Sequence, residues 1–354
     1  MNKLEPYLNK DQRFDLLFID NIRFHFIIGK SRSGTTLLSS LVSKNPQILA
    51  THEAQFMLVF YKQFKHKINW TKKDVRFILK NLWIRQELMR EQWQVDMAFL
   101  EGLLFHHLKD LNYQRFCKIV YTCHHNYTNQ IDTILDKNPI YSLHLDKWID
   151  LFPEAKFIIL VRDYRDQYIS MNKDKLKPYS SKGLTFMWSY HYHKIQSNPQ
   201  LNETNHIYLK FEDLINKSQK TLQKTAFFLK IDNQYSSENN DAFIKKPSVN
   251  SNPMEQLFYQ HHQKANQAIE TKKQTDWSVI PKEYLIDLEA YNGQLGEQWG
   301  YLKSTGVSNK KINFFKKNLI RFFSERMYSL PIFIQKFIYS LGRFLTKIKT
   351  TLPS

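Results

Sequence analysis

The stretch RFHFIIGKSRSGTTLLSSLV at residues 23–42 decides the fold. Its first seven residues form a short apolar run rich in β-branched and aromatic side chains, which is typical of a buried strand. The apolar positions 37, 38, 41 and 42 recur at helical spacing, and Asn45-Pro46 ends the helix that they predict. Between these two elements lies the polar segment GKSRSG, residues 29–34. The stretch therefore predicts a strand, a polar loop and a helix.

The polar loop has the G-x-x-x-x-G spacing of a phosphate loop. Gly34 lets the backbone approach an anion closely, and the following helix directs its free N–H groups and its dipole at that anion. Hydroxyl donors can come from Ser33, Thr35 and Thr36. A loop that binds ATP needs a lysine directly after the second glycine. Thr35 occupies that position and the basic residue lies inside the loop, as Arg32 or Lys30, so a Walker ATPase is disfavoured. An ordinary strand–helix turn is the structural alternative.

Further strands and helices follow along the chain. Lys156–Val161 is an apolar run that predicts a buried strand of a parallel sheet. The other predicted strands are 118–122 and 206–211. Helices are predicted over most of 56–115, over 139–151, and in a segment that ends at 229. Within the first of these helical regions, Trp70, Trp83 and Trp93 are predicted to be buried. Residues 232–253 predict a loop. The sequence thus predicts an α/β fold, with a P-loop-like parallel sheet flanked by helices and a basic amphipathic helical tail at the C-terminus.

Composition limits the partners of the chain. Its 354 residues carry 51 basic and 33 acidic side chains, a net charge of +18 that favours anionic ligands or surfaces. The two cysteines, Cys117 and Cys123, are too few to build a disulfide framework, so we expect a reducing compartment. The first twenty residues contain no long apolar run of the kind that a secretory signal needs. We expect a cytoplasmic protein.

The last 52 residues differ in charge from the rest. Residues 303–354 contain eleven lysines and arginines and one acidic residue, Glu325. We therefore expect a domain at 1–302 and a separate tail at 303–354. Within 312–350, aromatic and aliphatic residues recur every three to four positions with basic residues between them, which favours a peripheral anchor at the inner face of an anionic membrane. Packing of these helices on the domain is the alternative, and we expect no nucleic-acid partner.

A second motif strengthens the interpretation of the loop. The segment FPEAKFIILVRDYR, residues 152–165, places Arg162 at the carboxyl end of a predicted buried strand, with Ser170 eight positions later. Ligands of open α/β sheets bind at such ends. Together, the loop at 32–38 and this segment resemble the 5′-phosphosulfate and 3′-phosphate motifs of sulfotransferases that use 3′-phosphoadenosine 5′-phosphosulfate, in the form found in tyrosylprotein sulfotransferases and bacterial relatives. A structural ion pair of Arg162 with Asp163 or Asp166 is the alternative.

The resemblance implies catalytic residues. Glu53 lies twenty-one positions after Arg32, the spacing of the general base in tyrosylprotein sulfotransferases. His52 is the alternative base, because its ordinary pKa suits neutral pH. Lys137, in the segment DKNP, resembles the catalytic lysine of the family, although the flanking Asp136 and Asn138 depart from the family pattern. Lys137 and Arg32 are expected to stabilise charge on the leaving phosphate. Glu53 as a cap or ion-pair residue and Lys137 as a turn lysine are the structural alternatives.

Three further features are matched by the same resemblance. Phe211, in the segment FEDL, corresponds to an aromatic residue beside the adenine of the donor. Trp277 and the segment LGEQWGY at 295–301 resemble the last motif of the family, in which Lys272 or Lys273 would supply the basic residue. Trp188, His191 and His193 stand where relatives contact substrate, but a packed aromatic helix fits them equally well. The histidine spacings match no common zinc pattern, so no metal is expected.

We therefore predict a sulfotransferase that moves a sulfuryl group from 3′-phosphoadenosine 5′-phosphosulfate to a hydroxyl acceptor. A saccharide or lipid-linked glycan acceptor is favoured over peptide tyrosine. The donor-binding residues are predicted at 32–36 and at Arg162, Ser170 and Phe211. Two alternatives remain, a P-loop phosphotransferase that uses ATP, and a non-catalytic nucleotide- or membrane-binding protein.

Overall fold

The computed structural model describes residues 11–83, 87–172, 185–232, 276–321, 330–331, 333–335 and 337–338. The chain divides into two compact units. The sheet unit comprises Arg23–Thr51 and Gln130–Asn318, and the helical unit comprises Met1–Ile22, His52–Asn129 and Leu319–Ser354.

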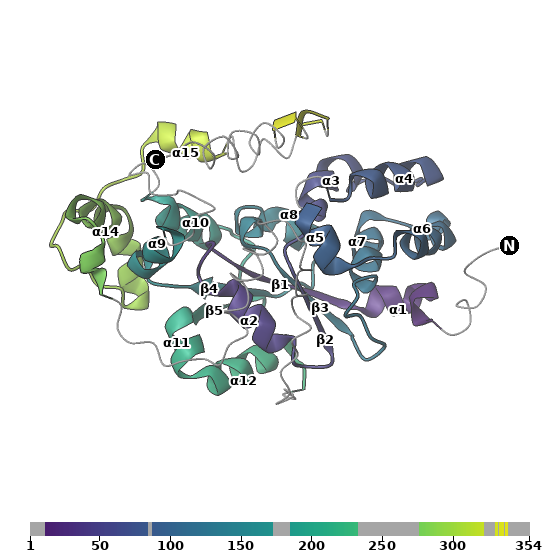
Figure 1. Cartoon of the computed structure of the whole chain (residues 1–354), viewed down its shortest axis with the longest axis horizontal. Helices are drawn as coiled ribbons and strands as arrows, with labels where there is room; N and C mark the ends of the chain where they lie inside the picture. Colours follow the sequence, from purple (N-terminus) through teal and green to yellow (C-terminus); the bar gives the residue numbers. More distant parts are fainter. Residues whose placement is uncertain are drawn as a thin grey trace, which may run out of the picture. The chain divides into compact units, whose positions relative to one another are not determined.

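The sheet unit is built on five parallel strands in the order β2-β3-β1-β4-β5 (Figure 1). The strands are β1 (Arg23–Gly29), β2 (Ile48–Thr51), β3 (Thr133–Lys137), β4 (Phe157–Val161) and β5 (His206–Lys210). After β1 the chain continues toward β2 on one side of the sheet, whereas after β4 it continues toward β5 on the other. The β1–β4 boundary is therefore a topological switch point, where α/β sheets bind ligands at the carboxyl ends of their strands.

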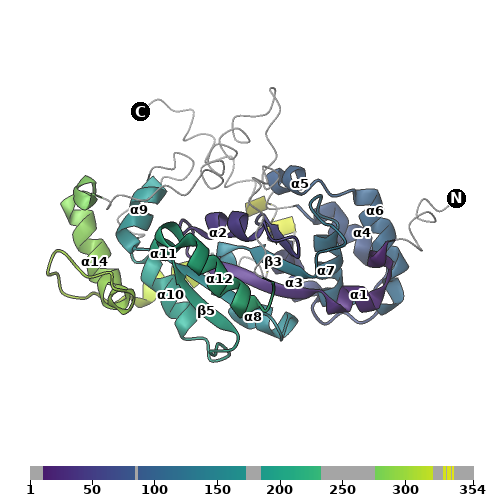
Figure 2. The same cartoon turned by 90° about the horizontal axis from the view of Figure 1, so that it is seen from below.

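Helices cover both faces of this sheet, as the two perpendicular views show (Figures 1 and 2). One face carries α2 (Thr35–Val42), α11 (Phe211–Asn216) and α12 (Ser218–Leu229), with an aliphatic core that includes Ile27, Leu38 and Leu229. The other face carries an aromatic core in which Phe26 stacks on Trp148 and Phe157. The remaining elements of this unit are η3 (Pro139–Leu143), α8 (Leu145–Leu151), α9 (Tyr164–Asn172), α10 (Met187–Gln196), η6 (Trp277–Val279), α14 (Lys282–Gly296) and η7 (Glu297–Trp299).

The helical unit contains short helices around a second aromatic core. Trp70 stacks on Phe116, and Trp93 packs edge-on against Phe56 and Tyr121. Its described elements are η1 (Gln12–Phe14), α1 (Leu16–Asn21), α3 (Phe56–Phe64), α4 (Lys72–Asn81), α5 (Glu87–Trp93), α6 (Met97–His106), η2 (Leu108–Asp110) and α7 (Tyr113–Thr122). The predicted burial of Trp70, Trp83 and Trp93 is confirmed.

The predicted α/β fold with a parallel sheet is confirmed, but one strand prediction is wrong. Residues 118–122 belong to α7, whose first turn is capped by the Asn112 side chain. A short apolar run does not distinguish a strand from a helix that is buried on most sides. The strands β2 and β3 were not predicted. In β3, the buried polar residues Asp136 and Lys137 interrupt the apolar pattern that predicts a buried strand. The predicted helix at 139–151 is interrupted at His144, between η3 and α8.

The start of the C-terminal basic region contacts α14. Lys310 pairs with Asp287 at 2.9 Å, and its backbone N–H donates to the Ala290 carbonyl. The helix α15 (Phe314–Arg321) follows, with the Phe314 and Phe315 side chains 81% and 73% exposed. No helix in the described part of the chain is long and apolar enough to cross a membrane. The division at residue 302 stays a prediction, and most of 322–354, like most of the predicted loop at 232–253, lies outside the described residues.

Candidate active site

The polar loop at residues 29–34 follows β1 at the switch point and has an unusual backbone. Gly29, Arg32 and Gly34 have φ angles of 141°, 73° and 92°. Positive φ is costly for a residue with a Cβ atom, so Arg32 adopts a conformation that its surroundings must hold. A Cβ on Gly29 would lie 2.4 Å from the Leu160 carbonyl oxygen, and one on Gly34 would lie 2.3 Å from the Phe211 ring. Both glycines are therefore required by close packing as well as by φ.

The helix α2 begins immediately after this loop. Gly34 is its N-cap residue and makes no side-chain cap to the first amide groups of α2. Thr35 and Thr36 lie in the first turn. The N-terminus of a helix that follows a strand in this way is suited to bind an anion, because the free N–H groups and the helix dipole both favour negative charge.

Arg162 lies beside the loop, one residue after β4. Its Nη1 atom donates to the Arg32 carbonyl at 3.2 Å, and its guanidinium lies over the Phe211 ring at 4.2 Å. Its Nε atom is buried and has no hydrogen-bond partner among the described residues. Burial lowers the pKa of Arg162, against the opposing effect of the nearby Asp166, Glu212 and Asp163 carboxylates. An arginine is always charged in a protein, so a buried donor without an acceptor indicates a site that fits an anion.

Ser170 connects the helix after β4 with the loop. It lies two turns into α9, and its Oγ atom accepts a hydrogen bond from Arg32 Nε at 3.1 Å. The residues Arg32, Gly34, Arg162, Ser170 and Phe211, predicted from three separate motifs, therefore lie together at one edge of the sheet.

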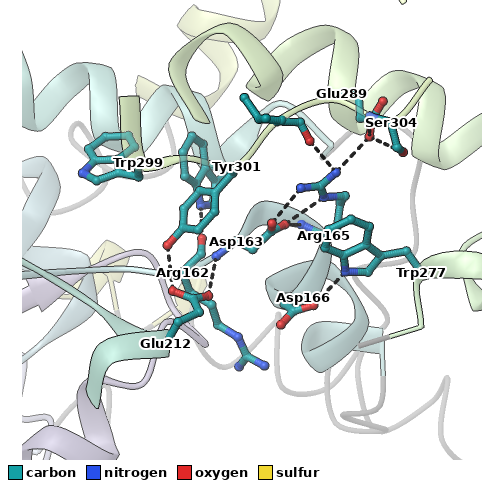
Figure 3. Close-up of polar contacts among 12 residues, drawn as sticks. Arg162, Asp163, Arg165, Asp166, Glu212, Trp277, Glu289, Trp299, Tyr301 and Ser304 are labelled. Carbon is teal, nitrogen blue, oxygen red and sulfur yellow. Dashed lines mark hydrogen bonds and ion pairs between the residues drawn. The ribbon is translucent and has the colours of Figure 1, made fainter. Parts of the chain in front are cut away.

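The alternative of a structural ion pair for Arg162 is not observed. Within the described ranges no carboxylate forms an ion pair with Arg162. Asp163 instead pairs with Arg165 at 2.8 Å, and Asp166 accepts from Trp277 Nε1 at 2.9 Å. Figure 3 shows Arg165 within this cluster and the Arg162 guanidinium pointing away from it.

Contacts behind Arg162 fix its backbone (Figure 3). The Trp188 indole donates to the Arg162 carbonyl at 2.9 Å, and the next backbone N–H, of Asp163, donates to Glu212 Oε1 at 3.2 Å. Tyr301 donates to the other oxygen of Glu212 at 2.8 Å. Trp188 is buried and packs on Tyr192, as in a packed aromatic helix, and His191 is also buried.

Lys137 and Asn138 lie at the carboxyl end of β3, next to β1. Lys137 pairs in register with Ile27, and the Asn138 N–H donates to the Ile27 carbonyl. Both residues are buried, and neither polar atom of the Asn138 side chain has a hydrogen-bond partner within the described ranges. These positions put Lys137 on the same edge of the sheet as the loop.

The two candidate bases belong to the helical unit. His52 and Glu53 are the first two residues after Thr51, the last residue of β2. His52 is buried, and its carbonyl accepts from Trp93 Nε1 at 3.3 Å. Their catalytic roles stay predictions. Lys272 and Lys273 lie outside the described residues.

Sequence reasoning missed several residues that hold the loop. The Gln167 side chain donates to the Ser31 carbonyl at 2.6 Å, and the Tyr192 hydroxyl contacts Ser33 at 3.2 Å. These contacts join residues 136 and 159 positions apart, so no local motif could reveal them. Among the described residues, no group of three or more His, Cys, Asp or Glu side chains could hold a metal ion.

Comparisons with known proteins identify the class of protein. The sequence pattern of the sulfotransferase family matches residues 25–235. This match spans more than half of the 354 residues, and the chain therefore belongs to the sulfotransferase family. No curated protein matches the chain in a sequence search.

Solved structures of sulfotransferases are similar to this chain. The sulfotransferase domain from the Synechococcus PCC 7002 olefin synthase has a TM-score of 0.52 at 19% identity, over 79% of this chain and 96% of that domain. This likeness shows the fold. The sulfotransferase domain from the curacin biosynthetic pathway matches with a TM-score of 0.47 at 18% identity, over 80% of this chain and 99% of that one.

Proposed function

We propose that this sulfotransferase takes its sulfuryl group from 3′-phosphoadenosine 5′-phosphosulfate and transfers it to a hydroxyl group. The observation that carries the proposal is Arg162, which lies beside the loop at the switch point and whose buried Nε has no acceptor in the part of the chain that the structure describes. Two features beside this boundary support the binding of two anionic groups. One is the start of α2, where Gly34 makes no side-chain cap. The other is Arg162 with Ser170, which are linked through Arg32: Arg162 donates to the Arg32 carbonyl, and Ser170 accepts from Arg32 Nε. A nucleotide with phosphates at both the 5′ and 3′ positions matches two such sites.

The proposed roles follow from this pairing. The backbone of 32–36, with the Thr35 and Thr36 hydroxyl groups, holds the 5′-phosphosulfate, Arg162 and Ser170 hold the 3′-phosphate, and Phe211 lies beside the adenine. When bound, the donor supplies an activated sulfuryl group. Glu53 accepts the proton of the acceptor hydroxyl while the oxygen of that hydroxyl bonds to sulfur. Lys137 and Arg32 stabilise the negative charge that develops on the departing phosphate.

Binding of adenosine 3′,5′-bisphosphate, compared with ATP and Mg²⁺, tests the donor. We expect micromolar affinity for the bisphosphate by calorimetry, and a loss of about 100-fold in Arg162→Ala, since a charge-assisted contact to phosphate is removed. Arg76→Ala is the matched control, because Arg76 is 65% exposed and pairs with Glu101 on the surface. Tighter, Mg²⁺-dependent binding of ATP would overturn the proposal in favour of a phosphotransferase.

Turnover separates an enzyme from a binding protein. With a panel of hydroxyl acceptors and labelled donor, Glu53→Gln is expected to lower kcat by about 100-fold or more and to leave bisphosphate affinity unchanged. His52→Gln is the comparison for the alternative base. Equal turnover in Glu53→Gln and the wild type would exclude Glu53 as the base.

We also propose that the acceptor is a saccharide or lipid-linked glycan, and that the tail holds the enzyme at the inner face of an anionic membrane. The support is the basic composition of 303–354 and the exposed Phe314 and Phe315. Replacing both phenylalanines with serine is expected to reduce binding to phosphatidylserine vesicles, whereas Phe227→Ser, at a side chain 87% exposed elsewhere, is not. Equal vesicle binding by all three proteins would remove the membrane role.

A further inference from the structure

The Tyr192 hydroxyl occupies a junction between the loop and β4. Tyr192 lies on α10 and is fully buried. Its hydroxyl donates to the Leu160 carbonyl at 2.6 Å, lies 3.2 Å from Ser33 Oγ, and accepts from the Lys30 N–H at 3.4 Å. One oxygen atom therefore contacts two residues of the loop and one residue of the strand that precedes Arg162.

The direction of each hydrogen bond at this oxygen is determined. A carbonyl can only accept, so the single hydroxyl proton of Tyr192 goes to Leu160. Burial raises the pKa of Tyr192, so the proton stays on the phenol. The Ser33 hydroxyl must then donate to Tyr192, and the Lys30 amide donates as well. In this arrangement the Ser33 proton is not directed to a ligand.

The Leu160 carbonyl also lies where the loop begins. Gly29 pairs in register with Leu160, and a Cβ at Gly29 would lie 2.4 Å from the Leu160 oxygen. Leu160 is two residues before Arg162 on the same chain segment. A hydrogen bond to this carbonyl therefore fixes the strand that carries one anion site, while the other two bonds fix the loop that carries the second.

We propose that Tyr192 is a positioning residue. It holds the loop in the conformation that binds the 5′ end of the donor, and it fixes the position of the loop relative to Arg162. The inference rests on the proposed function for the identity of the donor. The loop needs such support, because Arg32 has a φ of 73° and no rigid element lies between Gly29 and Gly34. Without the phenol oxygen, the Lys30 amide and the Ser33 hydroxyl lose their buried acceptor.

The variant Tyr192→Phe keeps the ring, which packs on Trp188 and Trp299, and removes only the oxygen. We expect its affinity for adenosine 3′,5′-bisphosphate to fall about tenfold, because buried donors are left unpaired. Affinity for adenosine 3′-monophosphate, which has no group for the loop, is expected to stay the same. Ser33→Ala is expected to reduce bisphosphate affinity less in the Tyr192→Phe variant than in the wild type, because the Ser33 and Tyr192 hydroxyl groups act through one contact.

Tyr208→Phe is the matched control. Tyr208 lies against the same Trp299, at 5.7 Å compared with 5.5 Å for Tyr192, but its hydroxyl forms no hydrogen bond within the described part of the chain. Its removal is expected to change neither affinity.

Hydrogen exchange separates this inference from the identity of the donor. Without any ligand, the Lys30 amide is expected to exchange faster in Tyr192→Phe than in the wild type, while amides of α12 are unchanged. If the wild type does not bind the bisphosphate but Lys30 exchanges faster in the variant, the donor is wrong and the positioning role holds. If exchange is unchanged, or if both nucleotides weaken equally, Tyr192 does not position the loop.

Discussion

Two arginines at the β4–α9 junction differ in how their charge is satisfied. Arg165 is buried with two carboxylates, Asp163 at 2.8 Å and Glu289 at 3.1 Å, and its guanidinium lies 3.5 Å from the centre of the Trp277 ring. Arg162, three positions earlier, is half-buried, and within the described part of the chain it has no ion pair and its buried Nε has no hydrogen-bond partner. Figure 3 shows the two side chains pointing to different surroundings.

The difference separates a structural arginine from a binding one. The positive charge of Arg165 is balanced inside the protein, so its removal takes the cationic partner away from two buried carboxylates. The charge of Arg162 is only partly balanced, by carboxylates that are near but not in contact. A buried charge of this kind has a cost that a bound anion can offset. Replacement of Arg165 is therefore expected to affect mainly the stability of the protein, and replacement of Arg162 mainly the binding of an anion.

The largest expected effect is on stability, in Arg165→Ala. Breaking a buried ion pair by removing one partner costs about 3–5 kcal/mol of unfolding free energy. Arg162→Ala is expected to change that free energy by about 1 kcal/mol or less, because no ion pair is broken. Chemical denaturation of both variants measures the difference. Equal losses in the two variants would remove the distinction.

The second expected effect is on binding, in Arg162→Lys. Lysine keeps the charge but lacks the planar group that lies on Phe211 and donates to the Arg32 carbonyl. The affinity for adenosine 3′,5′-bisphosphate is expected to fall about tenfold, less than in Arg162→Ala. Calorimetry compares the three proteins. Full affinity in the lysine variant would mean that only the charge matters at this position.

How far sequence reasoning reached follows the same division. The loop and Arg162 were predicted because each belongs to a contiguous motif at the end of an apolar strand. Arg165 belongs to the same motif, but its structural role was not predicted, because one of its two carboxylate partners, Glu289, is 124 positions away. Likewise, β3 was missed because Asp136 and Lys137 are buried polar residues, which no hydrophobic pattern identifies as strand. Contacts between residues far apart in the sequence could not be predicted from local sequence patterns.

A smaller effect is expected at the contact that supports Arg162 from behind. Tyr301→Phe removes the hydrogen bond to Glu212, whose other oxygen accepts from the Asp163 backbone. Loss of one buried hydrogen bond to a charged group costs about 1–2 kcal/mol of unfolding free energy. Because Glu212 follows Phe211 directly, we also expect a twofold to threefold loss of bisphosphate affinity, an estimate of about 0.5 kcal/mol. Tyr208→Phe is again the control. Unchanged stability would show that Glu212 does not depend on Tyr301.

The smallest effect concerns the pH dependence of stability, through the Arg165 cluster. Burial alone would raise the pKa of Glu289, but hydrogen bonds from Thr305 and Ser304 together hold it below its ordinary value. Glu289 therefore takes up a proton at higher pH in the unfolded chain than in the folded chain. Its contribution to the free energy of unfolding is fully present above the ordinary pKa of glutamate. This contribution is lost as the pH falls through the lower pKa of the folded state.

Glu289→Gln removes the titrating group. We therefore expect the variant to be less stable than the wild type at neutral pH, because Arg165 loses one of its two carboxylates, and the difference to narrow as the pH falls from 6 to about 3. Urea denaturation at several pH values measures it, with Glu101→Gln, at a surface ion pair, as the control. A difference that stays constant over this range would mean that Glu289 stabilises the cluster by packing and hydrogen bonds alone. Arg165 would then be held mainly by Asp163, and the contrast with Arg162 would rest on that single pair.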